Sequence, residues 1–536
     1  MKKLILIIAF LTTFVSFSQQ DAWVYFNDKP NAAAFFSNPL SELSQRSLDR
    51  RTAQGIALAI NDAPLEVSYV NQITAATGIT IMAKSKWLNC LHIRGSVTDI
   101  QALLAFPFVN HVHFADNSLN NKMAVPAISS PINKSMEVQT NFNYGTSANQ
   151  IQMLNGHLLH QSNYTGSGKV IAVLDAGFPS VDVVSPFQRL RDNNQILGGY
   201  DYVNKSNNFY TGYNHGTLVL STMGGYVDGQ LVGTAPDAKY YLYITEDVNS
   251  ENPVEESNWV EAAEEADRVG VDIITSSLGY FGFDNANYGH TYSDMTGNSA
   301  FGSQGANIAF SKGIVVLASA GNSANSAEPH VGVPAEANDV LAIGAVKADR
   351  SYASFSSIGP SFDGRIKPDV MAQGQSAVLS NTLGSVVTAS GTSFSCPIMA
   401  GMIACFWQAI PWATNVQIVQ FVKQSADRYT NPDYLFGYGI PDFQLALDTA
   451  NLNSIANKKD TFVLFPNPTS SNITLSFPSD INKVEVLFYN ALGQVVLEKT
   501  IINSLSTISL DDLQPGIYFY KIQSSSMTQT GKLIKE

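Results

Sequence analysis

The strongest constraint on the fold is the alternation of apolar strands with helices between residues 141 and 450. The runs KVIAVLD, AKYYLYIT, VDIITSSLG, GIVVLASAGN and VLAIGAV each predict a buried strand, and residues 255–270 predict a helix between two of them. Strands without a polar face, separated by helices, are typical of a parallel sheet that helices cover on both faces. We therefore predict an α/β domain. Ligands of such sheets bind beyond the carboxyl ends of the strands.

A small α+β unit is predicted before this domain, over residues 19–120. The segments AWVYF, GITIMAKSKWLNCLHIRG and VNHVHF alternate like strands, whereas LSQRSLDRR and TDIQALLAF are typical of helices. In the second of these helices, Thr98 and Gln101 have the spacing of a capping box. Residues 121–140 are rich in Asn, Ser and Pro without a clear period, which predicts a linker and a natural cutting site.

The last part of the chain predicts a small all-β sandwich over residues 461–536. Residues 451–460 are polar and predict a second linker. After them come short alternating strands, with turn signals at Asn467-Pro468, at Gly493 and at Pro515-Gly516.

The first 18 residues have the pattern of a secretory signal peptide. An apolar stretch from Leu4 to about Phe17 follows two lysines, and Ser16 and Ser18 occupy the small-residue positions of a cleavage site before Gln19. The alternative, a permanent anchor, would need a longer apolar run. No other run is long enough to span a bilayer, so we expect an exported protein with no transmembrane segment after signal cleavage.

Composition limits the partners and the cross-links of the chain. A net charge of −13 argues against nucleic acid or an anionic membrane surface as a partner. Three cysteines are too few for a disulfide framework. Cys396 and Cys405 lie in one predicted helix, separated by roughly 13 Å along its axis, which is beyond disulfide reach. We expect both in the core.

Four polar residues stand where strands end or helices begin. KVIAVLDAGF ends a strand at Asp175, and YNHGTLVLSTMGG places His215 at the start of a helix. GIVVLASAGN brings Asn322 to the end of another strand, and GTSFSCPIMAG places Ser393 at the start of an apolar helix. Each has an ordinary structural interpretation, as a turn residue, a helix cap or a core histidine.

As a set, these residues have the chemistry of nucleophilic catalysis. A serine hydroxyl attacks only after a base removes its proton, and histidine can do so near neutral pH. A buried carboxylate can hold that histidine in one tautomer and stabilise the imidazolium. A side-chain amide such as that of Asn322, with N–H groups at a helix N-terminus, could hold the oxyanion of a tetrahedral intermediate.

The order of the motifs DAG, HGT, SAGN and GTSFSCP resembles that of the subtilisin-like serine proteases, over about residues 145 to 450. This resemblance implies a secreted serine endopeptidase made as a zymogen, which acts on protein or peptide substrates. It implies that Asp175 orients, that His215 is general base and then acid, that Ser393 attacks, and that Asn322 holds the oxyanion.

The resemblance also implies a set of substrate-binding residues. The backbone of Ser277, Leu278 and Gly279 would pair with an extended substrate as an added strand. Ala320 and Gly321 would be further substrate-binding residues.

The sequence departs from the family pattern at some positions near these motifs. Ala176 follows Asp175, Leu218 and Ile398 replace common histidines, and Tyr280 stands where glycine is frequent. The aromatic insert YFGFDNANYGHTY, which begins at Tyr280, either narrows the substrate cleft or packs on itself as a loop.

The flanking units resemble known companions of such proteases. The N-terminal unit is similar to the inhibitory propeptide and intramolecular chaperone of the family, so the chain's own propeptide is an expected partner. The segment FPNP…NALGQVV…LQPGIYFYKI resembles the sorting domain recognised by the type IX secretion machinery of certain Gram-negative bacteria. We expect transport across the inner membrane by the signal peptide and then across the outer membrane, to a secreted or cell-surface location. A carbohydrate- or protein-binding β-module is the alternative for this unit.

No cofactor is expected for catalysis. Relatives often bind structural calcium, but no loop with EF-hand spacing allows us to assign ligands. Two other functions stay open. A catalytically silent adhesin could keep the scaffold, and a serine esterase would share the acyl-enzyme step. The relative kcat/KM for protein and for a small ester distinguishes an esterase from a protease.

Overall fold

The computed structural model describes residues 19–120, 142–457, 462–469, 471–477, 481–502, 505–525 and 527–536. The predicted signal peptide (1–18) and the predicted linker 121–140 lie outside these residues. The described residues form two compact units, which divide between Leu447 and Asp448. The first unit contains the small N-terminal sheet and the large α/β domain, and the second contains the C-terminal strands.

Seven parallel strands form the central sheet of the α/β domain, in the order β13-β12-β11-β10-β5-β9-β6. This confirms the predicted α/β class. The strands are β5 (Val170–Asp175), β6 (Ile196–Asp201), β9 (Lys239–Ile244), β10 (Ile273–Ser276), β11 (Val315–Ser319), β12 (Leu341–Val346) and β13 (Val370–Gln373).

The two edge strands of this sheet, β6 and β13, were not among the strands that the sequence predicts. β6 reads ILGGYD and is half-buried, and its two glycines weaken the strand signal. β13 is only four residues long. A short edge strand shows little periodic pattern in its sequence. Whether such a segment becomes a strand depends on its pairing with the neighbouring strand.

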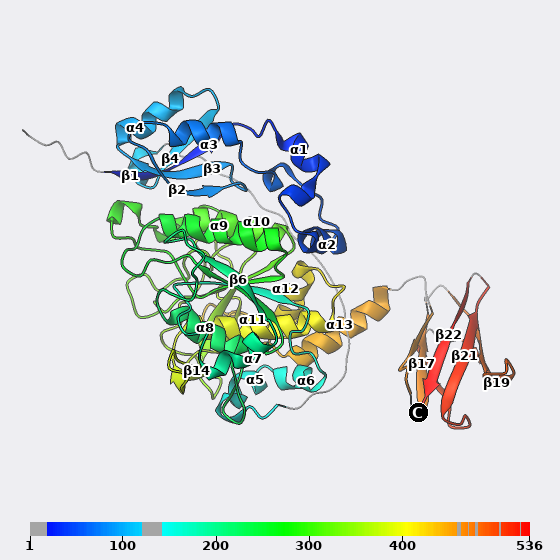
Figure 1. Ribbon diagram of the computed structural model, residues 1–536. Coiled ribbons are helices and arrows are strands. Elements are labelled where there is room, and N and C mark those ends of the chain that lie inside the picture. Colours follow the sequence, from blue (N-terminus) through cyan, green and yellow to red (C-terminus); the bar gives the residue numbers. More distant parts are fainter. Residues whose placement is uncertain are drawn as a thin grey trace, which may run out of the picture. The chain divides into compact units, whose positions relative to one another are not determined.

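Helices cover both faces of the sheet (Figure 1). The helices α8 (His215–Gly224) and α11 (Thr392–Ala409) pack against each other, and α11 contacts β10, β11, β12 and β13. On the other face lie α9 (Val254–Val269) and α10 (Phe301–Ser311). Cys396 and Cys405 are buried in α11 and form no disulfide with any described residue, which confirms their prediction as core residues.

Shorter elements complete the domain. They are α5 (Ala148–Gln152), α6 (Gly156–Gln161), α7 (Gln188–Asp192), α12 (Asn415–Gln424), and the two hairpins β7 (Tyr226–Val227) with β8 (Leu231–Val232) and β14 (Ala377–Ser380) with β15 (Val386–Ala389).

The N-terminal unit is a four-stranded antiparallel sheet with helices, as predicted. Its strand order is β2-β3-β1-β4, and Val24, Ile93 and Ile100 lie in its core. Its elements are β1 (Gln20–Phe26), α1 (Ala32–Ser37), α2 (Gln45–Ala53), α3 (Val67–Thr74), β2 (Thr80–Ser85), β3 (Cys90–Gly95), α4 (Val97–Ala102) and β4 (Val109–Phe114).

The cap of α4 differs from the predicted one. Ser96, not Thr98, is the N-cap, and its hydroxyl accepts a hydrogen bond from the N–H of Asp99 at 3.1 Å. Ser96 has extended backbone angles, which a cap requires, whereas Thr98 lies inside the first turn of the helix.

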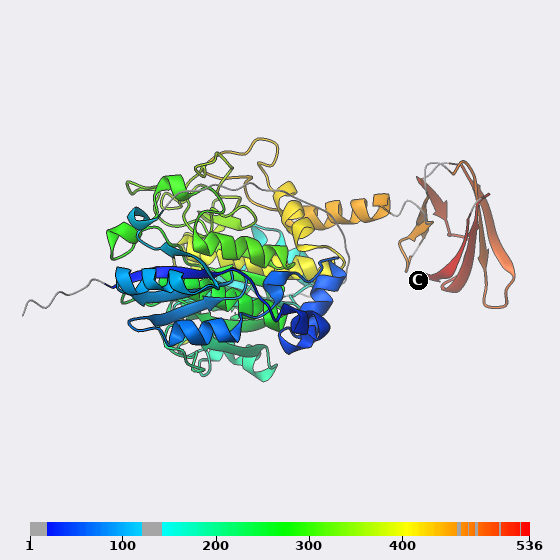
Figure 2. The same cartoon turned by 90° about the horizontal axis from the view of Figure 1, so that it is seen from above.

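The N-terminal sheet lies over α9 and α10 (Figures 1 and 2). Trp23 on β1 stacks on Phe301 of α10, with ring centroids 5.0 Å apart, and its indole N–H donates to Ser257 of α9 at 2.9 Å. Glu264 of α9 accepts three hydrogen bonds from the last residue of β2 and the turn that follows it. The donors are the Ser85 hydroxyl at 2.6 Å and the N–H groups of Lys86 at 3.0 Å and Trp87 at 2.9 Å.

Buried charges make a second contact between this unit and α9. The Arg51 guanidinium on α2 donates to both carboxylate oxygens of Asp267, each at 2.8 Å, and also to Asp62 at 2.8 Å. Arg50 contacts Asp267 as well. Arg51 and Asp267 have at most 2% of their side-chain surface exposed, so they are strongly desolvated. Removal of Asp267 would leave the buried guanidinium of Arg50 without its carboxylate partner, which is strongly destabilising.

The helix α13 (Phe443–Asn457) extends beyond the point where the sequence predicts a linker. Residues 451–457 belong to this helix, and the remaining predicted linker residues 458–460 lie outside the described ones. No glycine or proline occurs between Phe443 and Asp460, so no local signal stops the helix at Ala450.

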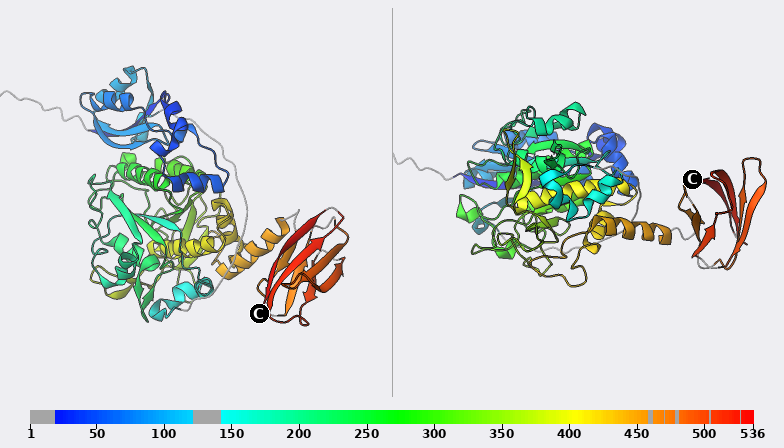
Figure 3. Two further views of the ribbon diagram at one scale, coloured as in Figure 1. Left: turned by 45° about the vertical axis from the view of Figure 1, so that its right-hand side comes forward. Right: turned by 90° about the horizontal axis from the view of Figure 1, so that it is seen from below.

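The C-terminal unit consists of two antiparallel sheets, in the orders β16-β17-β20 and β19-β18-β21-β22 (Figure 3). Ile473, Leu475, Phe488 and Ile522 lie in its apolar core. The predicted all-β unit is therefore confirmed. Its strands are β16 (Val463–Phe465), β17 (Asn472–Ser476), β18 (Val484–Tyr489), β19 (Val495–Ile501), β20 (Leu505–Ser509), β21 (Gly516–Gln523) and β22 (Thr528–Lys535).

Candidate active site

The candidate catalytic residues lie at strand ends and helix starts of the α/β domain. Asp175 is the last residue of β5, His215 is the first residue of α8, and Ser393 is the second residue of α11. Asn322 follows β11 by three residues. Because the strands are parallel, their carboxyl ends lie at one edge of the sheet, where this fold class binds ligands.

Asp175 and His215 form a hydrogen-bonded pair. The imidazole Nδ1 lies 2.8 Å from Oδ1 of Asp175, which is fully buried. The same oxygen accepts the N–H of Ala176 at 2.7 Å. Since an ionised carboxylate only accepts hydrogen bonds, Nδ1 carries the hydrogen and Nε2 keeps its lone pair. This tautomer can act as a base.

The carboxylate also changes the acidity of His215. Burial lowers the pKa of the imidazole, whereas the charge of Asp175 and its hydrogen bond raise that pKa, and the net result is a pKa above the ordinary 6.5. The pair therefore stabilises the imidazolium that forms when the base takes a proton.

Ser393 is nearly buried, with 9% of its surface exposed. Its hydroxyl donates to the carbonyl oxygen of Ser277 at 3.4 Å, and the Ser277 hydroxyl donates to the carbonyl oxygen of Ser393 at 2.8 Å. Among the described residues no hydrogen bond joins Ser393 to His215. The ring of the next residue, Phe394, is close to the imidazole, with ring centroids 6.1 Å apart. A serine hydroxyl turns about one bond, and catalytic hydrogen bonds often tighten only when substrate binds.

Asn322 is oriented by a residue that the sequence did not single out for this role. Its Oδ1 accepts hydrogen bonds from the N–H of Thr392 at 2.9 Å and from the Thr392 hydroxyl at 3.0 Å. Among the described residues no group accepts a hydrogen bond from the amide nitrogen Nδ2, so this donor is left for another acceptor. A Cβ atom on Gly391 would lie 3.7 Å from both this Nδ2 and the N–H nitrogen of Ser393. Two donors therefore flank a space that the glycine leaves open.

Gly321 gives Asn322 its position. Its φ of +102° is a conformation that favours glycine, and a Cβ atom there would come within 2.8 Å of the Ser357 hydroxyl. Its N–H donates to the Thr392 hydroxyl at 3.2 Å. Ala320, the other predicted substrate-binding residue of this turn, is 1% exposed, and its N–H donates to Ile343 within the sheet.

The predicted substrate-binding edge follows β10. Ser277 is buried, Leu278 is half-buried and Gly279 is exposed. Within the described part of the chain, no hydrogen bond uses the backbone of Leu278 or Gly279. Pairing resumes at Tyr280, whose N–H donates to the Val333 carbonyl at 2.8 Å. Backbone groups left unpaired between two paired residues can bind an extended peptide.

The aromatic insert contacts the N-terminal unit, so it is more than a loop packed on itself. The Tyr288 hydroxyl accepts the N–H of Asp21 at 3.2 Å and donates to Gln20 at 3.1 Å. The Asn287 amide donates to the Asp116 carboxylate at 3.1 Å. Sequence reasoning left this question open because the partners lie about 170 and 270 residues away along the chain.

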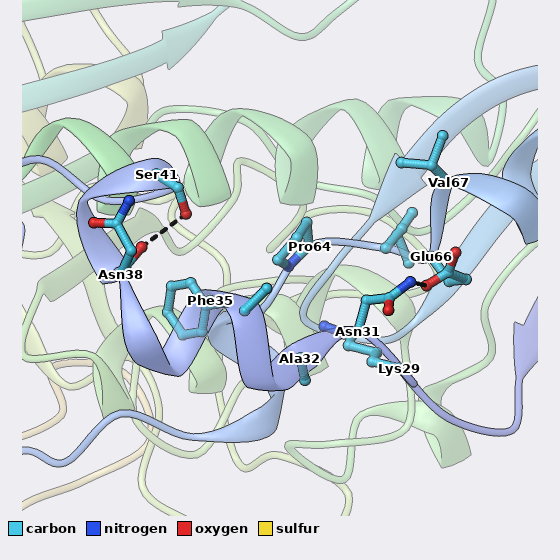
Figure 4. Close-up of a pocket in the computed structure, with 11 residues that line it drawn as sticks. Lys29, Asn31, Ala32, Phe35, Asn38, Ser41, Pro64, Glu66 and Val67 are labelled. Atoms are coloured by element: carbon cyan, nitrogen blue, oxygen red, sulfur yellow. Dashed lines mark hydrogen bonds between the residues drawn. The ribbon is translucent and has the colours of Figure 1, made fainter.

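A hollow of about 390 Å³ lies in the N-terminal unit, away from these residues (Figure 4). On its lining, the Asn31 amide donates to Glu66 at 2.7 Å, and the Ser41 hydroxyl donates to the carbonyl of Asn38 at 2.8 Å. None of the candidate catalytic residues lines it.

Three family models match the chain in the same order as its units. The Subtilase family model matches residues 166–439. A model described as the Peptidase S8 propeptide domain of Bacteroidota matches residues 21–130, and one described as a Secretion system C-terminal sorting domain matches residues 463–536.

Curated relatives match the region of the α/β domain. Subtilisin NAT from Bacillus subtilis subsp. natto is 30% identical over 299 residues, which cover 55% of this chain and 70% of the relative. Subtilisin from Bacillus pumilus is also 30% identical, with 55% of this chain and 97% of the relative covered. Serine protease AprX from Bacillus subtilis (strain 168) is 28% identical, with 51% and 65% covered. From the family match, the relatives and the parallel sheet together, the chain belongs to the subtilase family of serine endopeptidases.

Proposed function

We propose that this serine endopeptidase cleaves peptide bonds through an acyl-enzyme on Ser393, with His215 as the base and Asp175 as its orienting partner. The observation that carries the proposal is the 2.8 Å hydrogen bond between His215 and the buried Asp175, at the same sheet edge as Ser393. This bond gives His215 the tautomer and the basicity that activation of a serine requires.

The steps follow from the geometry. His215 Nε2 takes the proton of the Ser393 hydroxyl while Oγ attacks the substrate carbonyl carbon. The oxyanion that forms accepts hydrogen bonds from Asn322 Nδ2 and the N–H of Ser393. His215 then gives its proton to the leaving amine, which breaks the peptide bond. Water, activated by the same imidazole, hydrolyses the acyl-enzyme and restores Ser393.

The substrate would lie extended along the backbone of Ser277, Leu278 and Gly279, close to the Ser393 hydroxyl. The N–H and C=O groups of Leu278 and Gly279, which make no hydrogen bond among the described residues, would pair with it as a neighbouring strand would. Gly321 would keep the path to the oxyanion donors open because it has no side chain. The buried Ala320 would pack beneath this turn and hold it in position.

We further propose that residues 19–120 act as the chain's own inhibitor and folding aid, and that residues 141–450 are the mature peptidase domain. The match to a propeptide model supports this, as do the buried contacts of Glu264 and Asp267 with the N-terminal unit. The proposed cut falls within residues 121–140, which the sequence predicts to be a linker.

For localisation, we propose transport by a signal peptide in residues 1–18, followed by passage across the outer membrane through the type IX machinery. The sorting-domain match supports the second step. Among the described residues, no helix has the length and apolar character needed to cross a membrane. Residues 461–536 would carry the sorting signal.

A fluorophosphonate probe tests the nucleophile and its base together. We expect the probe to label Ser393 in the matured protein, located by peptide mass analysis. The labelling rate will fall as the pH drops through a value above 6.5, because the protonated imidazole cannot accept the Ser393 proton and Asp175 raises its pKa. No label at Ser393, or a midpoint at or below 6.5, would contradict the assignment.

Replacement of the oxyanion donor gives an independent test. Asn322→Ala will lower kcat by about 10²–10³, the loss typical of one such donor, with KM changed little. Asn325→Ala is the matched control, since Asn325 is also exposed and its one side-chain hydrogen bond within the described residues goes to the Ser354 carbonyl at 3.1 Å. Equal losses in both variants, measured on one fluorogenic peptide, would refute a role for Asn322 in the reaction.

A further inference from the structure

The N-terminal unit contacts the ends of two helices of the α/β domain through its own helix α2 (Figure 1). Arg46 donates from Nε to the Gly270 carbonyl at 2.8 Å, and Arg50 donates from Nε to the Lys312 carbonyl at 3.1 Å. Gly270 and Lys312 are the residues that end α9 and α10. The last carbonyls of a helix have no partner within it, so α2 supplies donors that these two helices need.

Gln54, the residue that follows α2, joins two further segments of the α/β domain. Its side-chain amide donates to the Gly313 carbonyl at 2.8 Å, and its Oε1 accepts the N–H of Asn415, the first residue of α12, at 2.9 Å. The contacts of this region therefore reach three helices. Its four polar side chains are called the α2 clamp below: Arg46, Arg50, Arg51 and Gln54.

Charged groups cross the boundary between the two parts in both directions. Arg51 of the clamp binds Asp267 of α9, with both hydrogen bonds at 2.8 Å, and Lys312 binds Asp62 of the N-terminal unit at 2.9 Å. These four side chains are between 0% and 4% exposed. Burial raises the pKa of Asp267, but the charge of Arg50 and the hydrogen bond of Arg51 bring it below its ordinary value, so the acid is ionised. Desolvated charge pairs of this kind slow the dissociation of a complex.

The clamp lies at the edge of the sheet opposite to the candidate active site. The Asp272 carboxylate, which Arg46 contacts, accepts the N–H of Val170 at 2.8 Å. Val170 begins β5 and Asp175 ends it, a separation of roughly 17 Å along an extended strand. Among the described residues, no hydrogen bond or ion pair joins residues 19–120 to any of the four candidate catalytic residues. Docking through the clamp and occupation of the active site are therefore separable.

We propose that the α2 clamp keeps the N-terminal unit on the peptidase after the chain is cut, as a subunit of the active enzyme. The proposal rests on the proposed function, since it starts from a peptidase that cuts off its own N-terminal unit. It adds the fate of that unit: inhibition ends with the cut, whereas the docked unit stays.

The described contacts are compatible with a unit that is docked but does not inhibit. Such a unit blocks the enzyme only if part of the chain occupies the place of the substrate, and the backbone of Leu278 and Gly279 is left unpaired by the described residues. Before the cut, the segment that joins the two parts is tethered at both ends, which favours its binding at the active site. After the cut, one tether remains, so substrate can compete for the site.

Native mass spectrometry of the matured protein, after reaction with a fluorophosphonate, tests both parts of the proposal at once. Denatured chains report only the cut, whereas native mass shows which chains stay together. We expect one species that contains the peptidase, the N-terminal fragment and the probe, with the probe on Ser393. Separation of the fragment from the peptidase would overturn the proposal. So would a fragment-bound species that stays unlabelled while free peptidase reacts, because the unit would then be an inhibitor only.

Asp267→Asn removes one charge from the surface that the clamp binds. The fragment should leave the matured enzyme at least about tenfold faster after dilution, as expected for one member of a buried charge pair. The rate of labelling at Ser393 should not change. Glu265→Gln is the matched control, because Glu265 lies two residues earlier in α9 and pairs with Arg268 of the same helix. Equal dissociation rates in Asp267→Asn and wild type would contradict the role of the clamp.

Arg46→Ala replaces Asp267→Asn if that variant does not fold. Arg46 belongs to the N-terminal unit and its side chain is 43% exposed, so its truncation leaves the core of the peptidase unchanged. We again expect faster loss of the fragment. Gln45→Ala is the control in this case, since the one side-chain hydrogen bond of Gln45 among the described residues goes to Asp49 of the same helix at 2.8 Å.

Fluorophosphonate labelling separates failure of this proposal from failure of the proposed function. If the peptidase reacts at Ser393 but the fragment has left it, retention is wrong and the peptidase assignment stands. If neither the free nor the fragment-bound peptidase reacts, the peptidase assignment is wrong instead. An uncut chain that reacts at Ser393 would overturn both the proposed cut and the retention that follows it.

Discussion

Ser393→Ala will keep its N-terminal unit, whereas the wild-type chain will lose about one hundred residues when the two are incubated in parallel after purification. The reason is that removal of the propeptide by the chain itself needs the acyl-enzyme on Ser393. Intact mass measures the result. Turnover of a peptide substrate should fall by about 10⁶, as expected when the nucleophile of such a triad is removed.

Ser395→Ala is the control for this experiment. Ser395 lies two residues further along α11, is fully buried, and its hydroxyl donates to the carbonyl of Thr392 at 3.0 Å. It tests whether loss of a buried hydroxyl from this helix is enough to stop maturation, and we expect it to mature. If wild type and Ser393→Ala both stay whole but only wild type reacts with the fluorophosphonate, another protease removes the propeptide. If neither reacts, the scaffold is catalytically silent.

Asp175→Asn will lower kcat by about 10⁴, the loss typical for the aspartate of such a triad. The carboxylate charge is lost, so the imidazolium that forms during attack is no longer stabilised. The pKa of His215 should also fall, since burial, which lowers it, remains, while the charge of Asp175, which raises it, is gone. The midpoint of the labelling rate against pH will therefore move to lower pH.

The shift in midpoint distinguishes a catalytic role of Asp175 from a structural one. Asp201→Asn is the matched control, because Asp201 is also a buried acid at the end of a strand and accepts the N–H groups of Val203 at 3.0 Å and Asn204 at 2.9 Å. Asp201→Asn will lower the stability of the protein, but the midpoint of its labelling rate against pH will not change. An unchanged midpoint in Asp175→Asn would refute the proposed role of the carboxylate.

The local sequence pattern was sufficient to predict the central strands. It also predicted where in their strands or helices the candidate catalytic residues lie. The apolar run that ends at Asp175 and the helix that begins at Ser393 each lie within one short window of sequence, and burial of such runs is a local requirement. The same reasoning failed at β6 and β13, because an edge strand is defined by the neighbour with which it pairs.

The sequence by itself determined the class of the fold, the order of the three units and the residue types available for catalysis. Only the tertiary structure decided which groups meet. Thr392 orients Asn322 from 70 residues away, and Asp116 binds the insert at Asn287. Contacts of this kind join segments far apart in the chain, and no periodic signal within one segment encodes its partner in another.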